Sequence, residues 1–131
     1  MIAAHDFYEN PFAKFWITDG ILFFQYKPNT AIDLKVAQLV VTDRIHFQRE
    51  RSYPILCDLR GVVSTDKAGR DYLANFGSVL ASAVCLVVHE KLLLTISTFY
   101  LQVNKPSVST QIFSSETAAV QYLERFVSGE S

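Results

Sequence analysis

Three residues of this sequence have side chains suited to proton transfer or cation binding, and all three lie near the ends of apolar runs. Asp58 stands near the end of one run, and Asp66 follows it closely. His89 comes directly after a second run, 83–88. Functional groups in open α/β sheets often lie at the carboxyl ends of strands, where two carboxylates and an imidazole could hold a cation or exchange protons. The alternative, which we favour, is that the carboxylates shape a loop and cap a helix and that His89 is a surface histidine, so we expect no enzyme.

The patterns of other common sites are missing. Cys57 and Cys85 form no CxxC pair and have no histidine beside them, so we expect buried free thiols. Neither GxGxxG nor GxxxxGK occurs, which argues against a phosphate-binding loop. We therefore expect neither a metal nor a cofactor.

Composition narrows the class of partner. The chain has 131 residues, a formal net charge of −1, 50% hydrophobic residues and 13% aromatic residues, which suits one globular domain over residues 1–131. A near-neutral chain without basic clusters offers no face for nucleic acid or for an anionic membrane surface. No apolar run approaches the roughly 18 residues of a membrane-spanning helix, and residues 1–10 do not resemble a signal peptide. Because the cysteines are expected to be free, we expect a cytoplasmic protein.

The elements that would position these residues alternate between strands and helices. Asp19-Gly20 separates two apolar runs, 15–17 and 21–26, and such a pair predicts a β-hairpin. Apolar periodicity then predicts helices over 33–50, 66–77 and 90–103 and after Ser114 or Ser115, with strands at 54–59, 83–88 and 110–113. The order β-β-α-β-α-β-α-β-α predicts an α/β domain, a mixed sheet flanked by helices. We expect residues 1–12 to be a loosely ordered N-terminal segment.

Two aspartates and a glycine are placed to begin and end the predicted helices. Asp33 precedes the first apolar stripe, and Thr65 or Asp66 precedes the second. Their side-chain oxygens can accept hydrogen bonds from the free N–H groups of a helix start. Gly77 is expected to end the second helix.

One stretch carries a family resemblance. The predicted strand ends in Asp58-Leu59-Arg60-Gly61-Val62, and Asp66-Lys67-Ala68-Gly69 then opens a helix that continues to Leu73. This resembles STAS domains of the anti-sigma-factor antagonist (SpoIIAA-like) type, which share Asp-Leu-Ser-Gly-Val followed by Asp-Ser-Ser-Gly and an apolar Leu. Gly61 and Gly69 also have plain structural explanations, a turn and close helix packing. The resemblance implies a STAS-like fold and a non-enzymatic regulatory module that binds a protein, or a second copy of itself as a homodimer.

The sequence departs from that pattern at one position. In anti-sigma-factor antagonists, the serine directly after the second aspartate is phosphorylated by a partner kinase, and here that position is Lys67. The resemblance therefore implies that the usual phosphoacceptor is missing. Ser64 and Thr65 could accept phosphate near the helix start, although we favour turn and capping roles for both. The predicted interaction surface consists of Arg60, Ser64, Thr65, Asp66, Lys67 and Arg70.

An alternative function comes from the aromatic residues of the N-terminal half. The run 15–26 is similar to that of uncharacterised bacterial STAS-like proteins, which share a broader likeness with CRAL-TRIO lipid-binding domains. In this alternative, the hairpin and the predicted helix 90–103 enclose a cavity for a small apolar molecule. The candidate ligand or interface residues are Trp16, Phe24, Leu93, Phe99 and Tyr100.

Overall fold

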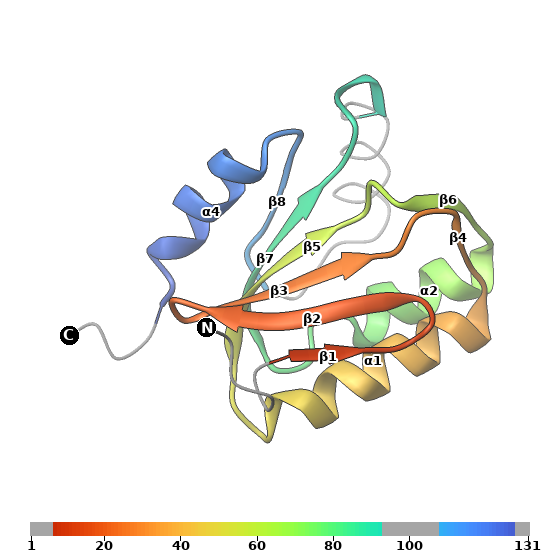
Figure 1. The fold of residues 1–131 in the computed structure, drawn as a ribbon, viewed down its shortest axis with the longest axis horizontal. Coiled ribbons are helices and arrows are strands. Elements are labelled where there is room, and N and C mark those ends of the chain that lie inside the picture. Colours follow the sequence, from red (N-terminus) through yellow and green to blue (C-terminus); the bar gives the residue numbers. More distant parts are fainter. Residues whose placement is uncertain (1–6, 93–107, 128–131) are drawn as a thin grey trace.

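The computed structural model describes residues 7–92 and 108–127. The main sheet has the strand order β1-β2-β3-β5-β7-β8, and β4 and β6 form a second, two-stranded sheet (Figure 1). The strands are β1 (Phe7–Glu9), β2 (Ala13–Thr18), β3 (Ile21–Tyr26), β4 (Thr30–Ile32), β5 (Tyr53–Asp58), β6 (Val62–Thr65), β7 (Ala81–Val87) and β8 (Thr110–Phe113). The helices are α1 (Leu34–Gln48), α2 (Lys67–Phe76), the 3-10 turn η2 (Glu90–Leu92) and α4 (Glu116–Glu124).

The main sheet is mixed, as predicted. β1, β2 and β3 pair antiparallel, whereas β3, β5, β7 and β8 pair parallel. The predicted hairpin is confirmed, with Thr18 opposite Ile21 and the turn residues Asp19 and Gly20 at φ values of 53° and 81°. Positive φ at both turn positions matches the right-handed twist of the flanking strands, which explains the Asp-Gly pair.

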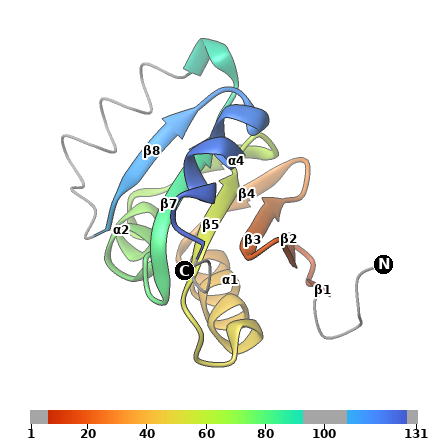
Figure 2. The same ribbon diagram turned by 90° about the vertical axis from the view of Figure 1, so that its left-hand side faces the viewer.

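Helices cover both faces of the sheet (Figures 1 and 2). One apolar cluster joins α1 to the sheet through residues such as Val40 and Phe24, and a second joins α4 to it through Ala119 and Leu123. β5 and β7 are the strands buried between these layers, which explains their nearly continuous apolar sequences. None of the described helices combines the length and apolar character needed to cross a bilayer.

Three of the four predicted helix starts are confirmed, those at Asp33, Asp66 and Ser115, and at the last two of these the structure selects one of two candidate caps. Asp33 Oδ1 accepts a hydrogen bond from the Val36 N–H at 2.9 Å. Asp66 Oδ1, rather than the Thr65 hydroxyl, accepts from the Gly69 N–H at 2.7 Å and so caps α2. Ser115 caps α4, accepting from the Ala118 N–H at 3.2 Å.

Parts of the sequence prediction need correction. Residues 7–9, placed in a loosely ordered segment, form β1 because they pair antiparallel with β2. Tyr8 and the following Asn10 also donate hydrogen bonds to the Asp43 carboxylate. The strands β4 and β6 were not predicted, since each is short and lacks a clear apolar alternation. Of the predicted helix 90–103, Glu90–Leu92 form a 3-10 turn, and residues 93–103 lie outside the described residues.

Two glycines are required by close backbone approach. A Cβ at Gly61 would lie 2.5 Å from the Lys27 carbonyl oxygen, and one at Gly69 would lie 2.9 Å from that of Ile32. Gly61 lies in the expected turn, which the Val62 N–H closes on the Leu59 carbonyl oxygen at 3.0 Å. Its φ is not positive, so glycine is required here by the close approach to Lys27 and not by a left-handed backbone. Gly69 permits close packing, as expected.

We expect Gly61→Ala to lower the free energy of unfolding by about 1–3 kcal/mol, because backbone atoms would have to move to admit a methyl group. Urea unfolding measures this difference. Ser64→Ala, in the exposed neighbouring strand β6, is the control and should change stability by less than about 0.5 kcal/mol. Equal effects of the two substitutions would contradict the close approach at Gly61.

Candidate functional site

An ion pair organises the carboxyl end of β5. The guanidinium of Arg60 donates from Nε to Asp58 Oδ1 at 2.9 Å and from Nη2 to Oδ2 at 2.8 Å, and the Arg60 backbone N–H donates to Oδ1 at 3.0 Å. Gln25 Nε2 lies 3.4 Å from Oδ2. The Asp58 side chain is only 7% exposed, so these donors take the place of water around its carboxylate.

Arg60 also connects neighbouring elements. Its Nη2 lies 3.3 Å from Glu116 Oε1 at the start of α4, and its carbonyl oxygen lies 3.2 Å from His89 Nε2 after β7. Burial opposes ionisation of Asp58, but the hydrogen bonds and charge of Arg60 outweigh it and lower the pKa of this carboxyl. Arg60 therefore fixes the positions of β5, β7 and α4 at this edge of the sheet.

The three candidates for acid–base chemistry have separate partners. Asp58 accepts from Arg60, Asp66 caps α2, and His89 contacts the Arg60 carbonyl oxygen. Within residues 7–92 and 108–127, no hydrogen bond joins any two of the three, and no group of His, Cys, Asp and Glu could hold a metal ion. Loop shaping and helix capping account for the contacts of the two aspartates.

The predicted interaction residues form one continuous segment, which we call the loop–helix surface (residues 60–76). Ser64, Thr65, Asp66 and Lys67 are exposed, and the Lys67 side chain, at 82%, is the most exposed partner of any described ion pair. Lys67 Nζ lies 2.7 Å from Asp71 Oδ2, one helical turn later.

Arg70 connects the two elements of this surface, β6 and α2. Its Nη1 donates to the Thr65 hydroxyl at 3.0 Å and to the Thr65 carbonyl oxygen at 3.2 Å. These bonds tie α2 to the end of β6. Together with the Asp66 cap, they fix the conformation of the segment that carries the family resemblance.

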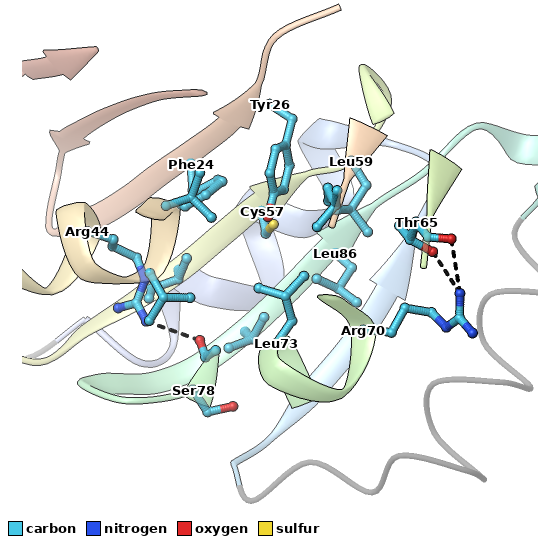
Figure 3. Close-up of a pocket in the computed structure, with 16 residues that line it drawn as sticks. Phe24, Tyr26, Arg44, Cys57, Leu59, Thr65, Arg70, Leu73, Ser78 and Leu86 are labelled. Carbon is cyan, nitrogen blue, oxygen red and sulfur yellow. Dashed lines mark hydrogen bonds between the residues drawn. The ribbon is translucent and has the colours of Figure 1, made fainter. Parts of the chain in front are cut away.

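Behind α2 lies a cavity of about 170 Å³, between the sheet and helices α1 and α2 (Figure 3). We call it the α1–α2 cavity. Apolar side chains from the sheet and both helices make most of its wall, among them Phe24, Val40, Ile55, Leu73 and Leu86. Thr65 and Arg70 line it where β6 meets α2, whereas Arg44, Gly77 and Ser78 line it near the end of α2.

Sequence reasoning missed Arg44, which is 2% exposed. It donates from Nη1 to Gln48 Oε1 and to the Val79 carbonyl oxygen (2.9 Å), and from Nη2 to the Gly77 carbonyl oxygen (3.2 Å). Burial lowers the pKa of Arg44 to about 10, so the guanidinium is charged at neutral pH. The available signal was its spacing, since Arg44 follows Ala37 by seven positions and Val41 by three on the buried stripe of α1.

The two cysteines are free thiols in different places. Cys57 lines the α1–α2 cavity, whereas Cys85 packs on the opposite side of the sheet against α4. Burial raises the pKa of each thiol to about 12. Both are therefore protonated at neutral pH and act as small apolar side chains.

The structure separates the predicted apolar-ligand residues. Phe24 is 5% exposed and lines the cavity, as the alternative function would require. Trp16 is half-buried and stacks on Phe23, with ring centroids 5.4 Å apart, away from the cavity. Leu93, Phe99 and Tyr100 lie outside the described residues.

Comparison of the sequence with known protein families identifies the family of this chain. A family model described as a domain of unknown function, DUF7793, matches residues 15–127. The chain belongs to the DUF7793 family. No curated protein sequence matches the chain at a significant level.

A solved structure has the same fold. It is an uncharacterised DUF3478-family protein from Shewanella loihica PV-4 with a SpoIIAA-like fold. It has a TM-score of 0.62 and 9% identity, over 88% of this chain and 98% of that chain. The DUF7793 chain therefore has a SpoIIAA-like fold, as the STAS resemblance implied, whereas the broader likeness to CRAL-TRIO domains stays a prediction.

The Asp58–Arg60 pair gives a pH-dependent prediction. At pH 7, Arg60→Met should lower the free energy of unfolding by roughly 1–3 kcal/mol, because a nearly buried carboxylate loses its charged donors. Since the folded pKa of Asp58 is lowered, the pair stabilises the protein above the carboxyl's usual pKa, and this contribution is lost as pH falls through the folded value.

Urea unfolding at pH 7 and pH 3 tests this. The difference between wild type and Arg60→Met should shrink at pH 3, where more of Asp58 is protonated. Arg51→Met, at an exposed arginine before β5, is the matched control and should have little effect at either pH. A constant difference at both pH values would contradict a role of the pair's charge.

Proposed function

We propose that this protein is a non-enzymatic regulatory module that binds a protein partner through the loop–helix surface. The observation that carries the proposal is the exposure of β6. Val63, Ser64 and Thr65 are all exposed, and Val63 is 63% exposed. Because side chains alternate along a strand, this places exposed residues on both of its faces.

The edge of β6 adds to this argument. Among the described strands, β6 pairs only with β4, so its other edge has no strand partner there. Edge strands with free backbone groups are places where another chain can add. The contacts of Asp66 and Arg70 already order the adjoining segment, so little conformational entropy would be lost there on binding.

The phosphoacceptor serine of anti-sigma-factor antagonists is absent here, and this suggests how the module differs from them. Lys67 occupies that position, with its ammonium group paired to Asp71 at the start of α2. Partner binding would therefore not be switched by phosphorylation at this position. The SpoIIAA-like fold supports the comparison with anti-sigma-factor antagonists.

The interaction surface can be tested with a photo-crosslinking amino acid at Val63, followed by purification of the captured protein and titration of the two purified proteins. Val63→Asp should weaken the affinity by about tenfold or more, as expected for a central apolar contact. Lys67→Glu should also weaken it, whereas Lys35→Glu, the same charge change at an exposed position of α1, should not.

A second copy of this chain is a candidate partner, and sedimentation velocity at increasing protein concentration would detect such a dimer. A dimer that dissociates in Val63→Asp but not in Lys35→Glu would support self-association through this surface. If the affinity of every captured partner, self included, is the same for all three variants, the proposed surface is wrong.

The missing phosphoacceptor can be tested separately. Lys67→Ser, incubated with ATP and a kinase that phosphorylates anti-sigma-factor antagonists, should gain the mass of one phosphate group, and the wild type should not. The same experiment with Ser64→Ala and Thr65→Val also present shows whether the phosphate lies at position 67. An unchanged mass for Lys67→Ser, or phosphorylated wild type, would contradict the assignment.

A second candidate function, binding of a small apolar molecule, is favoured by the α1–α2 cavity. Its described walls differ from those the sequence suggested, because α1 and α2 provide them together with β3, β5 and β7. Of the aromatic hairpin, Phe24 and Tyr26 contribute. The predicted helix 90–103 lies almost entirely outside the described residues, so its expected part in the cavity wall stays a prediction.

A further inference from the structure

The guanidinium of Arg44, at one end of the α1–α2 cavity, is buried without an anionic partner among the described residues. Arg44 is 2% exposed, and its three hydrogen-bond acceptors in the described chain are the neutral oxygens of Gln48, Gly77 and Val79. No described carboxylate lies within ion-pair distance of it. A buried charge without a counter-ion is costly, so this site favours an anion over a neutral group.

Arg44 also has donors to spare. A guanidinium carries five N–H groups, and three of those of Arg44 donate to described acceptors, two from Nη1 and one from Nη2. Nε–H and the second Nη2–H have no acceptor in the described chain. In many Arg–carboxylate pairs, Nε–H and one Nη2–H donate to the two carboxylate oxygens. Figure 3 shows Arg44 on the cavity wall near Ser78.

The remainder of the cavity suits an apolar body. Its volume of about 170 Å³ is close to that of an apolar cavity of about 150 Å³ that takes up benzene. The described lining residues include no aspartate or glutamate, so a bound anion would meet no like charge on the wall. Arg70, which also lines the cavity, adds a second positive charge.

We propose that the α1–α2 cavity binds a small carboxylic acid with an apolar body about the size of a benzene ring, its carboxylate paired with Arg44. The ring or short chain would lie among Phe24, Val40, Ile55, Leu73 and Leu86. This inference rests on the second candidate function, ligand binding in the cavity, and is independent of the loop–helix surface.

Isothermal titration of the wild-type protein with benzoate and with benzamide tests the inference. The two molecules have nearly the same shape but differ in charge. Benzoate should bind about tenfold tighter or more, because hydrogen bonds to a charged group exceed those to a neutral one by such a factor. Hexanoate and hexanamide, titrated in the same way, show whether a ring or a chain is the better body.

Two substitutions separate recognition of the charge from occupancy of the cavity. In Arg44→Gln, the preference for benzoate over benzamide should disappear while benzamide still binds. In Leu73→Trp, the indole should fill the cavity and abolish binding of both molecules. Leu39→Trp, the same change at an exposed position of α1, is the matched control and should bind as the wild type does.

The outcomes distinguish binding of a carboxylic acid from binding of any small apolar molecule in the cavity. Equal binding of benzoate and benzamide by the wild type, or a preference that survives Arg44→Gln, would overturn the carboxylic acid but leave apolar binding in place. Absence of binding by all four compounds, or binding unaffected by Leu73→Trp, would overturn both. If Arg44→Gln does not fold, the wild-type ratio and the Leu73→Trp comparison still decide the matter.

Discussion

The arrangement of the helices on one face of the sheet depends on two buried polar side chains of α1. Arg44 and Gln48 lie one turn apart, are 2% and 1% exposed, and hydrogen-bond each other. Arg44 donates to the carbonyl oxygens of Gly77 and Val79, and Gln48 Nε2 donates to that of Leu80 at 2.8 Å. The segment 77–80 joins α2 to β7, so these bonds fasten the end of one helix and the start of a buried strand to α1. Unpaired polar groups are costly inside a protein, so the bonds specify one position for this segment.

The position of α2 follows from this constraint. The C-terminal end of α2 is held by Arg44. Its N-terminal end is held by the Asp66 cap and by Gly69, whose lack of a side chain admits the Ile32 backbone. Between these two attachments the helix buries little of its own surface, since Gly69 is its one buried residue. The space between α2 and the sheet is the α1–α2 cavity, and the outer side of α2 is part of the loop–helix surface. One helix thus separates the two sites for which functions are proposed, and a molecule bound in the cavity would contact the helix that a protein partner contacts from outside.

Local sequence patterns predicted much of the fold, because the hairpin turn, helix caps and buried strands each depend on neighbouring residues. The structure confirms the turn at Asp19-Gly20 and the cap at Asp33, and it selects Asp66 over Thr65 and Ser115 over Ser114 as caps of the other two helices. β4 and β6 were missed because they exist through pairing with each other across the chain rather than through an apolar pattern of their own. Arg44 was missed for a similar reason, since two of its three acceptors, the carbonyl oxygens of Gly77 and Val79, lie more than thirty positions away in the sequence. The same holds for the cavity, whose walls come from β3 to β7 and which no single segment encodes.

The buried guanidinium of Arg44 fastens α1 to the segment after α2. Nuclear magnetic resonance of the arginine side-chain N–H groups tests this attachment most directly, with the exposed Arg51 as an internal reference. We expect the Arg44 side-chain protons to exchange with water far more slowly than those of Arg51 and to show nuclear Overhauser contacts to Gly77 and Val79. Exchange of the two arginines at the same rate, without contacts between Arg44 and the 77–80 segment, would contradict this account of how α2 is held.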